Sequence, residues 1–172
     1  MKKVLLSSLF LISILGFSQE TKFTFKKEGF TDYVVTEVKG TAPELYSKAI
    51  NWIKETYKNP DEVIKMTIVN EKVRIEGFQN NLNCIGSVCA DGIYVVEISF
   101  KDERYKFDPI SLLLKNGAGS FEVPFNDLSI YYDKKGELKK SSKEGLEKTI
   151  QLFDGLNESL KNYIVGDKKS DW

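Results

Sequence analysis

The chemistry open to this 172-residue sequence is restricted first by the absence of histidine. Ser-His-Asp and Cys-His catalysis are excluded, together with metal sites that depend on imidazole. Acid–base catalysis would fall to pairs of carboxylates, and the candidates are Glu97 with Asp108 and Asp102 with Glu103. Acidic residues on strands and turns are usually solvated, so we expect no catalytic residues and no enzymatic activity.

Two cysteines, Cys84 and Cys89, enclose four residues within a polar stretch between two strand-like runs. In an oxidising compartment this spacing predicts a disulfide that closes a hairpin loop, contributing about 2 kcal/mol of stability. The spacing is not that of a Cys-x-x-Cys redox pair, and the loop has no Lys or Arg that would lower a thiol pKa. A zinc site on these thiols would need carboxylate ligands, and none cluster near them.

The sequence also lacks the patterns by which cofactors and nucleic acids are usually bound. It has no glycine-rich phosphate loop, no EF-hand spacing and no zinc motif. Its 25 Lys plus Arg balance 25 Asp plus Glu, so it lacks the basic excess of a nucleic-acid-binding protein. We therefore expect no metal, no cofactor and no nucleic-acid partner.

The N-terminus has the pattern of an export signal. Lys2 and Lys3 precede an apolar run from Val4 to Leu15, and small residues then lead to Ser18. A charged start, a short apolar run and small residues are typical of a signal peptide, here cleaved near Ser18. The run is shorter than the roughly 20 residues that span a bilayer, so we expect no transmembrane anchor in the mature protein. We expect a periplasmic or secreted protein.

The elements that must position these residues follow from hydrophobic periodicity and helix-capping signals. Apolar and polar residues alternate in five strand-like runs, at 30–38, 63–69, 72–78, 94–100 and 104–114. Pro109 in the last run suggests an edge strand, a bulge or a bend. Capping-box sequences at 41–44 and 141–144 open two amphipathic helices, and the first ends before Pro60.

This order of elements predicts an α+β fold, β-α-β-β-β-β-α, in which two helices cover one face of a curved antiparallel sheet. We expect a signal peptide at 1–18 and a core domain at 19–115. A linker with a small hairpin would follow at 116–142, and a C-terminal helix with a polar tail would pack on the core at 143–172.

Several short segments between Phe30 and Lys115 together resemble a known family. They are Tyr33-Val34-Val35, Leu45-Tyr46, Asn51-Trp52-Ile53, Tyr57, Pro60, Val63-Ile64, Ile75-Glu76-Gly77 and Arg104-Tyr105. The family consists of secreted bacterial envelope proteins described as a domain of unknown function with a fold like that of the TATA-binding protein (TBP-like). The resemblance implies the same β-α-β-β-β-β-α layout and supplies no catalytic residues.

Two functions are compatible with such a domain. The first is a binding module that holds an apolar or amphipathic ligand in a cavity between the C-terminal helix and the sheet. The residues that would line this cavity are Trp52, Tyr94, Val96, Ile98, Phe100, Phe153, Leu156 and Tyr163. The alternative interpretation of these positions is a close-packed core without a ligand.

The second function is a structural or protein-interaction module of the envelope without a small-molecule ligand, for which the partner would be an unknown protein. Exposed aromatic residues would form its contact patch, namely Tyr131, Tyr132 and Trp172. Lysines would meet an anionic partner, or would simply be solvated, namely Lys134, Lys135, Lys139, Lys140 and Lys143. In either case we expect a monomer.

Overall fold

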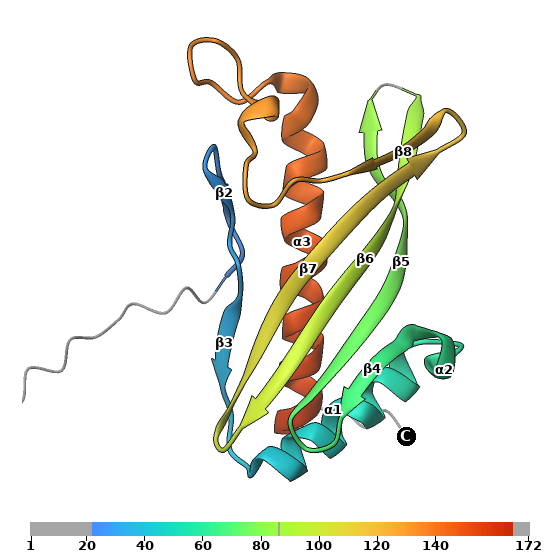
Figure 1. Cartoon of the computed structure of the whole chain (residues 1–172), viewed down its shortest axis with the longest axis vertical. Helices are drawn as coiled ribbons and strands as arrows, with labels where there is room; N and C mark the ends of the chain where they lie inside the picture. Colours follow the sequence, from blue (N-terminus) through green and yellow to red (C-terminus); the bar gives the residue numbers. More distant parts are fainter. Residues whose placement is uncertain (1–21, 86, 167–172) are drawn as a thin grey trace, which may run out of the picture.

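The computed structural model describes residues 22–85 and 87–166 (Figure 1). The predicted signal peptide and Trp172 lie outside these residues. The strands are β1 (Phe25–Lys26), β2 (Gly29–Phe30), β3 (Val34–Glu37), β4 (Ile64–Ile68), β5 (Lys72–Ile85), β6 (Val88–Lys101), β7 (Arg104–Asn116) and β8 (Gly119–Glu122). The helices are α1 (Ala42–Thr56), α2 (Pro60–Val63) and α3 (Lys140–Val165), with a 3₁₀ turn at Ser129–Tyr131.

An antiparallel sheet in the order β3-β7-β6-β5-β4 forms the main layer. β3 and β8 pair with opposite ends of the same edge of β7, at Arg104–Phe107 and Leu113–Asn116. Pro109 lies between these two pairings, beside the register shift opposite Val95 and Val96. Of the three predictions for Pro109, the bulge is confirmed. Proline lacks a backbone N–H, and Pro109 lies on the stretch of β7 where no described strand pairs with the edge that β3 and β8 share.

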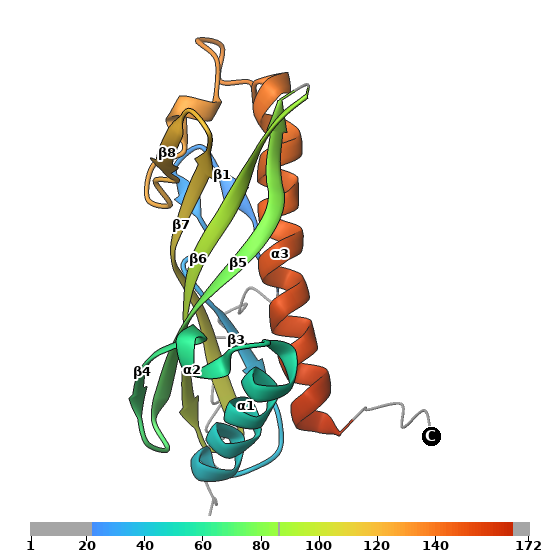
Figure 2. The same cartoon turned by 90° about the vertical axis from the view of Figure 1, so that its right-hand side faces the viewer.

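Both long helices lie on one face of the sheet, as predicted (Figure 2). α3 runs along the length of the molecule against β5, and α1 packs beside its C-terminal half, against β5, β6 and β7. The other face carries no helix in the described part of the chain. We call these the covered face and the open face of the sheet. The predicted α+β fold with one-sided helical cover is confirmed.

The start of α1 is fixed by side chains, as its capping-box sequence predicts. The Glu44 carboxylate accepts hydrogen bonds from the Thr41 N–H at 2.8 Å and from the Thr41 hydroxyl at 2.9 Å. These bonds hold the pKa of Glu44 below its usual value. The Ala42 N–H donates to Asp102 Oδ1 at 2.9 Å, so the β6–β7 turn supplies a second cap.

The start of α3 differs from the prediction. The helix begins at Lys140, and Lys139 is its N-cap without a side-chain hydrogen bond. Ser141 therefore already lies inside the first turn, where its hydroxyl cannot act as the N-cap. Glu144 instead pairs with Lys148 one turn later, Oε1 to Nζ at 2.8 Å. The predicted capping box at 141–144 is wrong because the N-cap is Lys139, two residues before the Ser141 that this pattern requires.

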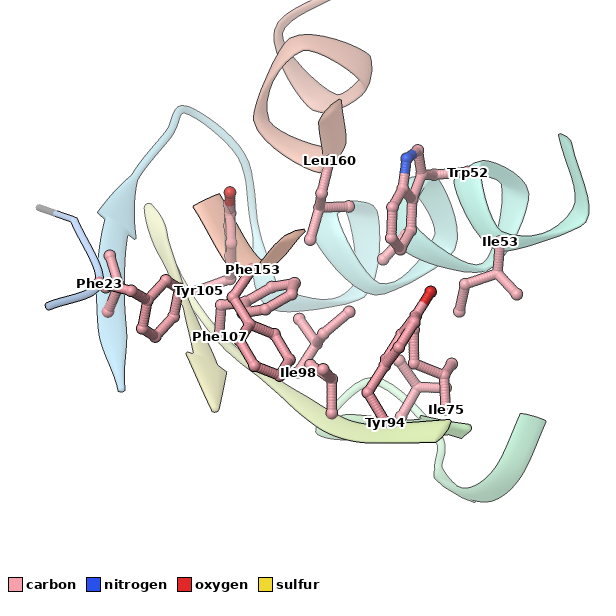
Figure 3. Packing of buried hydrophobic residues seen from close by; sticks show 14 of the residues in the cluster. Phe23, Trp52, Ile53, Ile75, Tyr94, Ile98, Tyr105, Phe107, Phe153 and Leu160 are labelled. Carbon is pink, nitrogen blue, oxygen red and sulfur yellow. The ribbon is translucent and has the colours of Figure 1, made fainter. Parts of the chain in front are cut away.

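Large aromatic side chains fill the layer between the helices and the sheet (Figure 3). The rings of Phe23 and Phe30 stack at 5.6 Å, and Phe153 of α3 meets Tyr94 of β6 edge-on at 6.2 Å. The predicted linker at 116–142 contributes β8 and also two buried side chains, Val123 and Leu128. This segment is therefore packed into the core, and the described residues form one packed unit.

Candidate functional site

The residues predicted to line a cavity between α3 and the sheet do come together, and they fill the space. Leu156 and Tyr163 pack against the core from its margin. The other six are at most 5% exposed, namely Trp52, Tyr94, Val96, Ile98, Phe100 and Phe153. In the middle of the covered face the structure therefore has a close-packed core, which was the alternative interpretation of these positions.

Polar groups at the ends of these core side chains find partners inside the protein. Trp52 Nε1 donates to Ser159 Oγ at 3.0 Å, and the hydroxyls of Tyr57 and Tyr94 lie 2.9 Å apart. Burial raises the pKa of both tyrosines above the ordinary value, and that of Tyr57 far above it. These hydrogen bonds are made within the core, so none of these groups depends on a ligand for its partner.

Glycine at position 77 allows the Tyr94 ring to take this place. Gly77 and Tyr94 are cross-strand partners in the β5–β6 ladder. A Cβ atom on Gly77 would overlap the Tyr94 ring, which lies across the glycine backbone. The close approach positions the Tyr94 hydroxyl beside Tyr57 of the α1–α2 connection.

Each of the two candidate carboxylate pairs has members with structural partners. Glu97 and Asp108 are cross-strand neighbours on the open face. Burial alone would raise the pKa of Glu97, but hydrogen bonds from Arg74 at 2.8 Å and Lys72 at 3.0 Å lower it below its usual value. Asp108 is paired with Lys106, Oδ2 to Nζ at 2.5 Å. Asp102, the neighbour of Glu103, caps α1.

The predicted aromatic patch is not exposed in the described part of the chain. Tyr131 and Tyr132 are half-buried and pack against the core, and burial raises the pKa of Tyr131. The lysines of the same region line the connection into α3. Lys139 Nζ donates to the carbonyl of Ile130 at 2.7 Å, and Lys143 lies 3.9 Å from Glu147. The rest of the lysine cluster is exposed.

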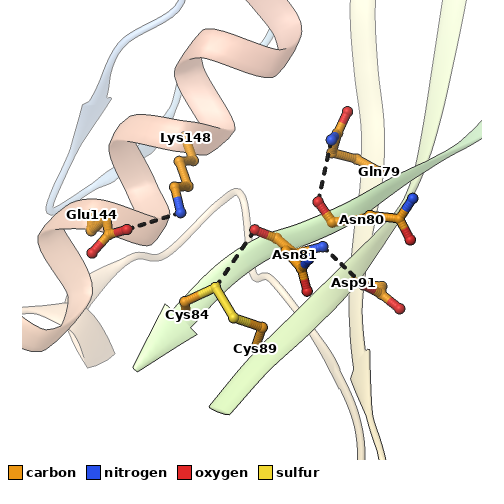
Figure 4. Close-up of a disulfide and its surroundings, with 8 residues drawn as sticks. All are labelled: Gln79, Asn80, Asn81, Cys84, Cys89, Asp91, Glu144 and Lys148. Atoms are coloured by element: carbon orange, nitrogen blue, oxygen red, sulfur yellow. Dashed lines mark hydrogen bonds and ion pairs between the residues drawn. A yellow bond between two sulfur atoms is a disulfide. The ribbon is translucent and has the colours of Figure 1, made fainter. Parts of the chain in front are cut away.

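The predicted disulfide between Cys84 and Cys89 is confirmed (Figure 4). Its surroundings differ from the expected loop, because β5 and β6 continue almost to the tip of their hairpin. Cys84 and Cys89 are directly opposite in the ladder, with Cα atoms 4.0 Å apart. A register shift between Gln79 and Asn83 accommodates the polar residues, and Asn81 adopts φ 51° there.

An open recess lies next to this disulfide, on the covered face of the sheet beyond the packed core. Its volume is about 360 Å³. Four strands contribute side chains, including Asn83 from β5, Val88 and Ala90 from β6, Leu114 from β7 and Phe121 from β8. We call it the distal recess.

The distal recess is hollow because the side chains there are small. Ala90 continues the row that carries Tyr94, Val96 and Ile98 nearer the middle of β6, and the β7–β8 turn adds Gly119. Two larger apolar side chains remain on the rim, where Val88 is 62% exposed and Phe121 is 47% exposed. The recess is thus a small cavity with an accessible apolar lining.

The first turns of α3 hold one wall of the recess. Gly145 packs directly against the side-chain amide of Asn83, and a Cβ at Gly145 would overlap that amide. Asn83 Oδ1 is buried and has no hydrogen-bond partner among the described residues. The disulfide lies one rung farther toward the hairpin tip and fixes the two strands that carry Asn83, Val88 and Ala90.

The distal recess was not predicted from the sequence. The stretch from Gln79 to Asp91 resembles a polar loop, and Asn116–Ser120 resembles a boundary between elements. One signal is present in hindsight, since the alternation Val88, Ala90, Gly92 extends the register of Tyr94 in β6. The small size of these side chains conceals that pattern.

Comparison with solved structures supports the fold. The chain is similar to a DUF4468 family protein from Bacteroides ovatus, with TM-score 0.62 and 9% identity over 85% of this chain and 92% of that one. It is also similar to a TBP-like protein from Parabacteroides distasonis, with TM-score 0.58 and 12% identity over 82% of this chain and 96% of that one. At these identities the likeness concerns the fold alone.

No protein-family model matches the sequence, and no curated protein matches it significantly. Among the described residues, no helix combines the length and the apolar character needed to cross a membrane. The expected layout, with a sheet covered on one face by helices, is that of the solved neighbours. The chain therefore has a TBP-like α+β fold, shared with a DUF4468 family protein.

Proposed function

We propose that the protein is a non-enzymatic binding module of the bacterial cell envelope that takes an apolar or amphipathic ligand in the distal recess. One observation carries this proposal: exposed apolar side chains, Val88 and Phe121, stand at the rim of a cavity in an otherwise close-packed layer. Concave sites with an apolar lining and a few polar groups are the usual form of small-molecule sites. The proposed cavity therefore lies at the distal end of the covered face, whereas the sequence predicted it in the middle of that face.

The size of the recess limits what it can take. A volume of about 360 Å³ is near the lower end of the roughly 300–1,000 Å³ range of ligand sites. It suits the end of an acyl chain or a single ring system better than a whole lipid. Asn116 and Ser120 at the margin provide hydrogen-bonding groups for the polar part of an amphipathic ligand.

The envelope location rests on two features. The disulfide fits an extracytoplasmic protein, because disulfides persist in oxidising compartments. The signal-like N-terminus suggests the route of export. N-terminal sequencing of the protein secreted by its host would test cleavage near Ser18, and an intact N-terminus would contradict it.

Ligand binding can be tested with dodecanoate as the probe. We expect the methyl NMR signals of Val88 and Leu114 to shift on titration, while those of Ile98 in the packed core stay unchanged. Ala90→Leu would fill the recess and weaken binding about tenfold. Thr67→Leu on the exposed surface of β4 creates the same side chain elsewhere and should leave binding unchanged.

Native mass spectrometry of the detergent-free protein provides a second readout, because a natural ligand would appear as added mass that the Ala90→Leu variant lacks. The alternative function is an envelope structural or protein-interaction module without a small-molecule ligand. It is favoured by the close packing beneath the middle of α3. Absence of both dodecanoate shifts and added mass would contradict the ligand proposal and leave this alternative.

A further inference from the structure

We infer that the open face of the sheet carries a second, anion-binding site for a phosphate group, at the end of the molecule that holds the β6–β7 turn. A groove of about 350 Å³ lies there, and its polar lining includes Tyr33, Ser99, Lys101, Arg104 and Lys106. We call it the cationic groove. It is separate from the distal recess on the covered face, because the β6–β7 turn and the ends of β5 and β6 that carry the disulfide lie at opposite ends of the sheet (Figure 1).

Strand register brings the cations together. Ser99 pairs with Lys106, and Lys101 pairs with Arg104, in two rungs of the β6–β7 ladder that are separated by one intervening rung. Side chains alternate between the faces of a strand. The intervening residues, Phe100 and Tyr105, are buried on the covered face, so the polar residues of these rungs share the open face.

One of the three cations is held in place by its neighbours. Lys106 Nζ pairs with Asp108 at 2.5 Å and lies 5.0 Å from the centre of the Tyr33 ring. Lys101 and Arg104 make no ion pair within the part of the chain that the structure describes. The groove therefore offers two uncommitted cations beside one fixed cation.

Most neighbouring carboxylates are already engaged elsewhere. Asp102 accepts a hydrogen bond from the Ala42 N–H, and Glu97 accepts bonds from Lys72 and Arg74. Glu37 is the cross-strand partner of Arg104, but no ion pair joins the two among the described residues. No carboxylate is among the residues that line the groove.

The donor set suits a phosphate group. The Arg104 guanidinium can bind two oxygens at once, Lys101 and Lys106 supply point charges, and the Ser99 hydroxyl adds a neutral donor. Tyr33, 48% exposed, offers a ring face beside the anion. In an envelope protein such a group could belong to a soluble phosphate ester or to a phospholipid headgroup, which present the same chemistry.

The test is an NMR titration of the full mature protein with inorganic phosphate and with glycerol 3-phosphate. We expect the largest backbone shifts at residues 99–106 and 33–37. The double variant Lys101→Glu, Arg104→Glu should weaken binding at least about tenfold, because two charge-assisted contacts are lost. The control Lys134→Glu, Lys135→Glu makes the same charge change in the exposed turn before α3, and should change binding less than about twofold.

Sedimentation with phosphatidylglycerol vesicles, compared with phosphatidylcholine vesicles, separates the two sources of phosphate. Binding to the anionic vesicles with no shift from glycerol 3-phosphate identifies a lipid headgroup, and shifts from the soluble ester identify a free ligand. Equal losses in the two double variants, shifts confined to residues outside 99–106 and 33–37, or no binding of any probe would each overturn the inference. Dodecanoate binding in the distal recess should be unaffected by either variant, so the two proposals can fail separately.

Discussion

The covered face of the sheet is filled in its middle and hollow at its distal end, although the same strands run through both regions. In the middle, β6 carries Tyr94, Val96 and Ile98, and α3 places Phe153 against them. At the distal end the same row of β6 carries Ala90. Side-chain size along one strand thus decides whether this face of the sheet forms a core or a site.

The largest expected effect comes from emptying the filled region. Phe153→Ala removes a fully buried ring that contacts four other aromatic rings, and should lower the free energy of unfolding by about 3–5 kcal/mol. Phe121→Ala at the rim of the distal recess should cost less than about 1 kcal/mol and should instead weaken dodecanoate binding. Urea unfolding of both variants measures this difference in stability. Equal losses of stability would contradict the distinction between a filled middle and a hollow distal end.

A pair of glycines in α3 sharpens the same comparison. Gly145 touches Asn83 at the recess, so Gly145→Ala should destabilise the protein by about 1–3 kcal/mol through overpacking. Gly155 has open space around its Cβ position, so Gly155→Ala should stabilise it by about 0.5–1 kcal/mol. Thermal unfolding should therefore shift in opposite directions, and a shift of the same sign in both would contradict the assigned packing.

Removing the disulfide tests how firmly the distal end is held. The double variant Cys84→Ser, Cys89→Ser should lose about 2 kcal/mol by the chain-entropy estimate for a short loop. Hydrogen exchange should accelerate at residues 81–91, with little change around Ile98. Uniform acceleration across the sheet would show that the disulfide supports the whole fold.

The smallest expected effect concerns pH and a charge on the open face. Because the pKa of Glu97 is lowered in the folded protein, its contribution to stability is present above the unfolded-state value of 4.5. That contribution should fall as the pH drops through the folded-state pKa. In Glu97→Gln this acid-induced loss should be smaller than in the native protein, as measured by urea unfolding from pH 6 to pH 3. An unchanged pH dependence would exclude this role.

The features that were predictable from the sequence are those set by nearby residues. The α1 capping box depends on Thr41 and Glu44 alone, and the β4–β5 hairpin follows from two alternating runs around Asn70. The disulfide followed from the two cysteines and the expected compartment. The residues expected to line a cavity were identified correctly as facing the interior. Whether they leave a cavity or fill it depends on how their side chains pack together in three dimensions, which the sequence does not reveal.

Features that depend on distant partners were missed. β5 continues through Gln79–Asn83 because β6 pairs on both sides of the register shift, which no local pattern reveals. Leu128 is buried because the 123–128 segment returns to the N-terminal hairpin, where its N–H meets the carbonyl of Lys27 at 3.1 Å. The distal recess depends on four strands at once, so its existence follows from the assembled sheet.

The cap that Asp102 provides for α1 has a consequence for the order of folding. The donor and acceptor of that bond are 60 residues apart, so the first turn of α1 lacks this partner until the β6–β7 hairpin has formed. The β5–β6–β7 hairpins join strands that are consecutive in the sequence, so their pairing can extend from the turns and form early. We therefore expect the β5–β6–β7 strands to form first and to act as the template on which α1, and then α3, become ordered.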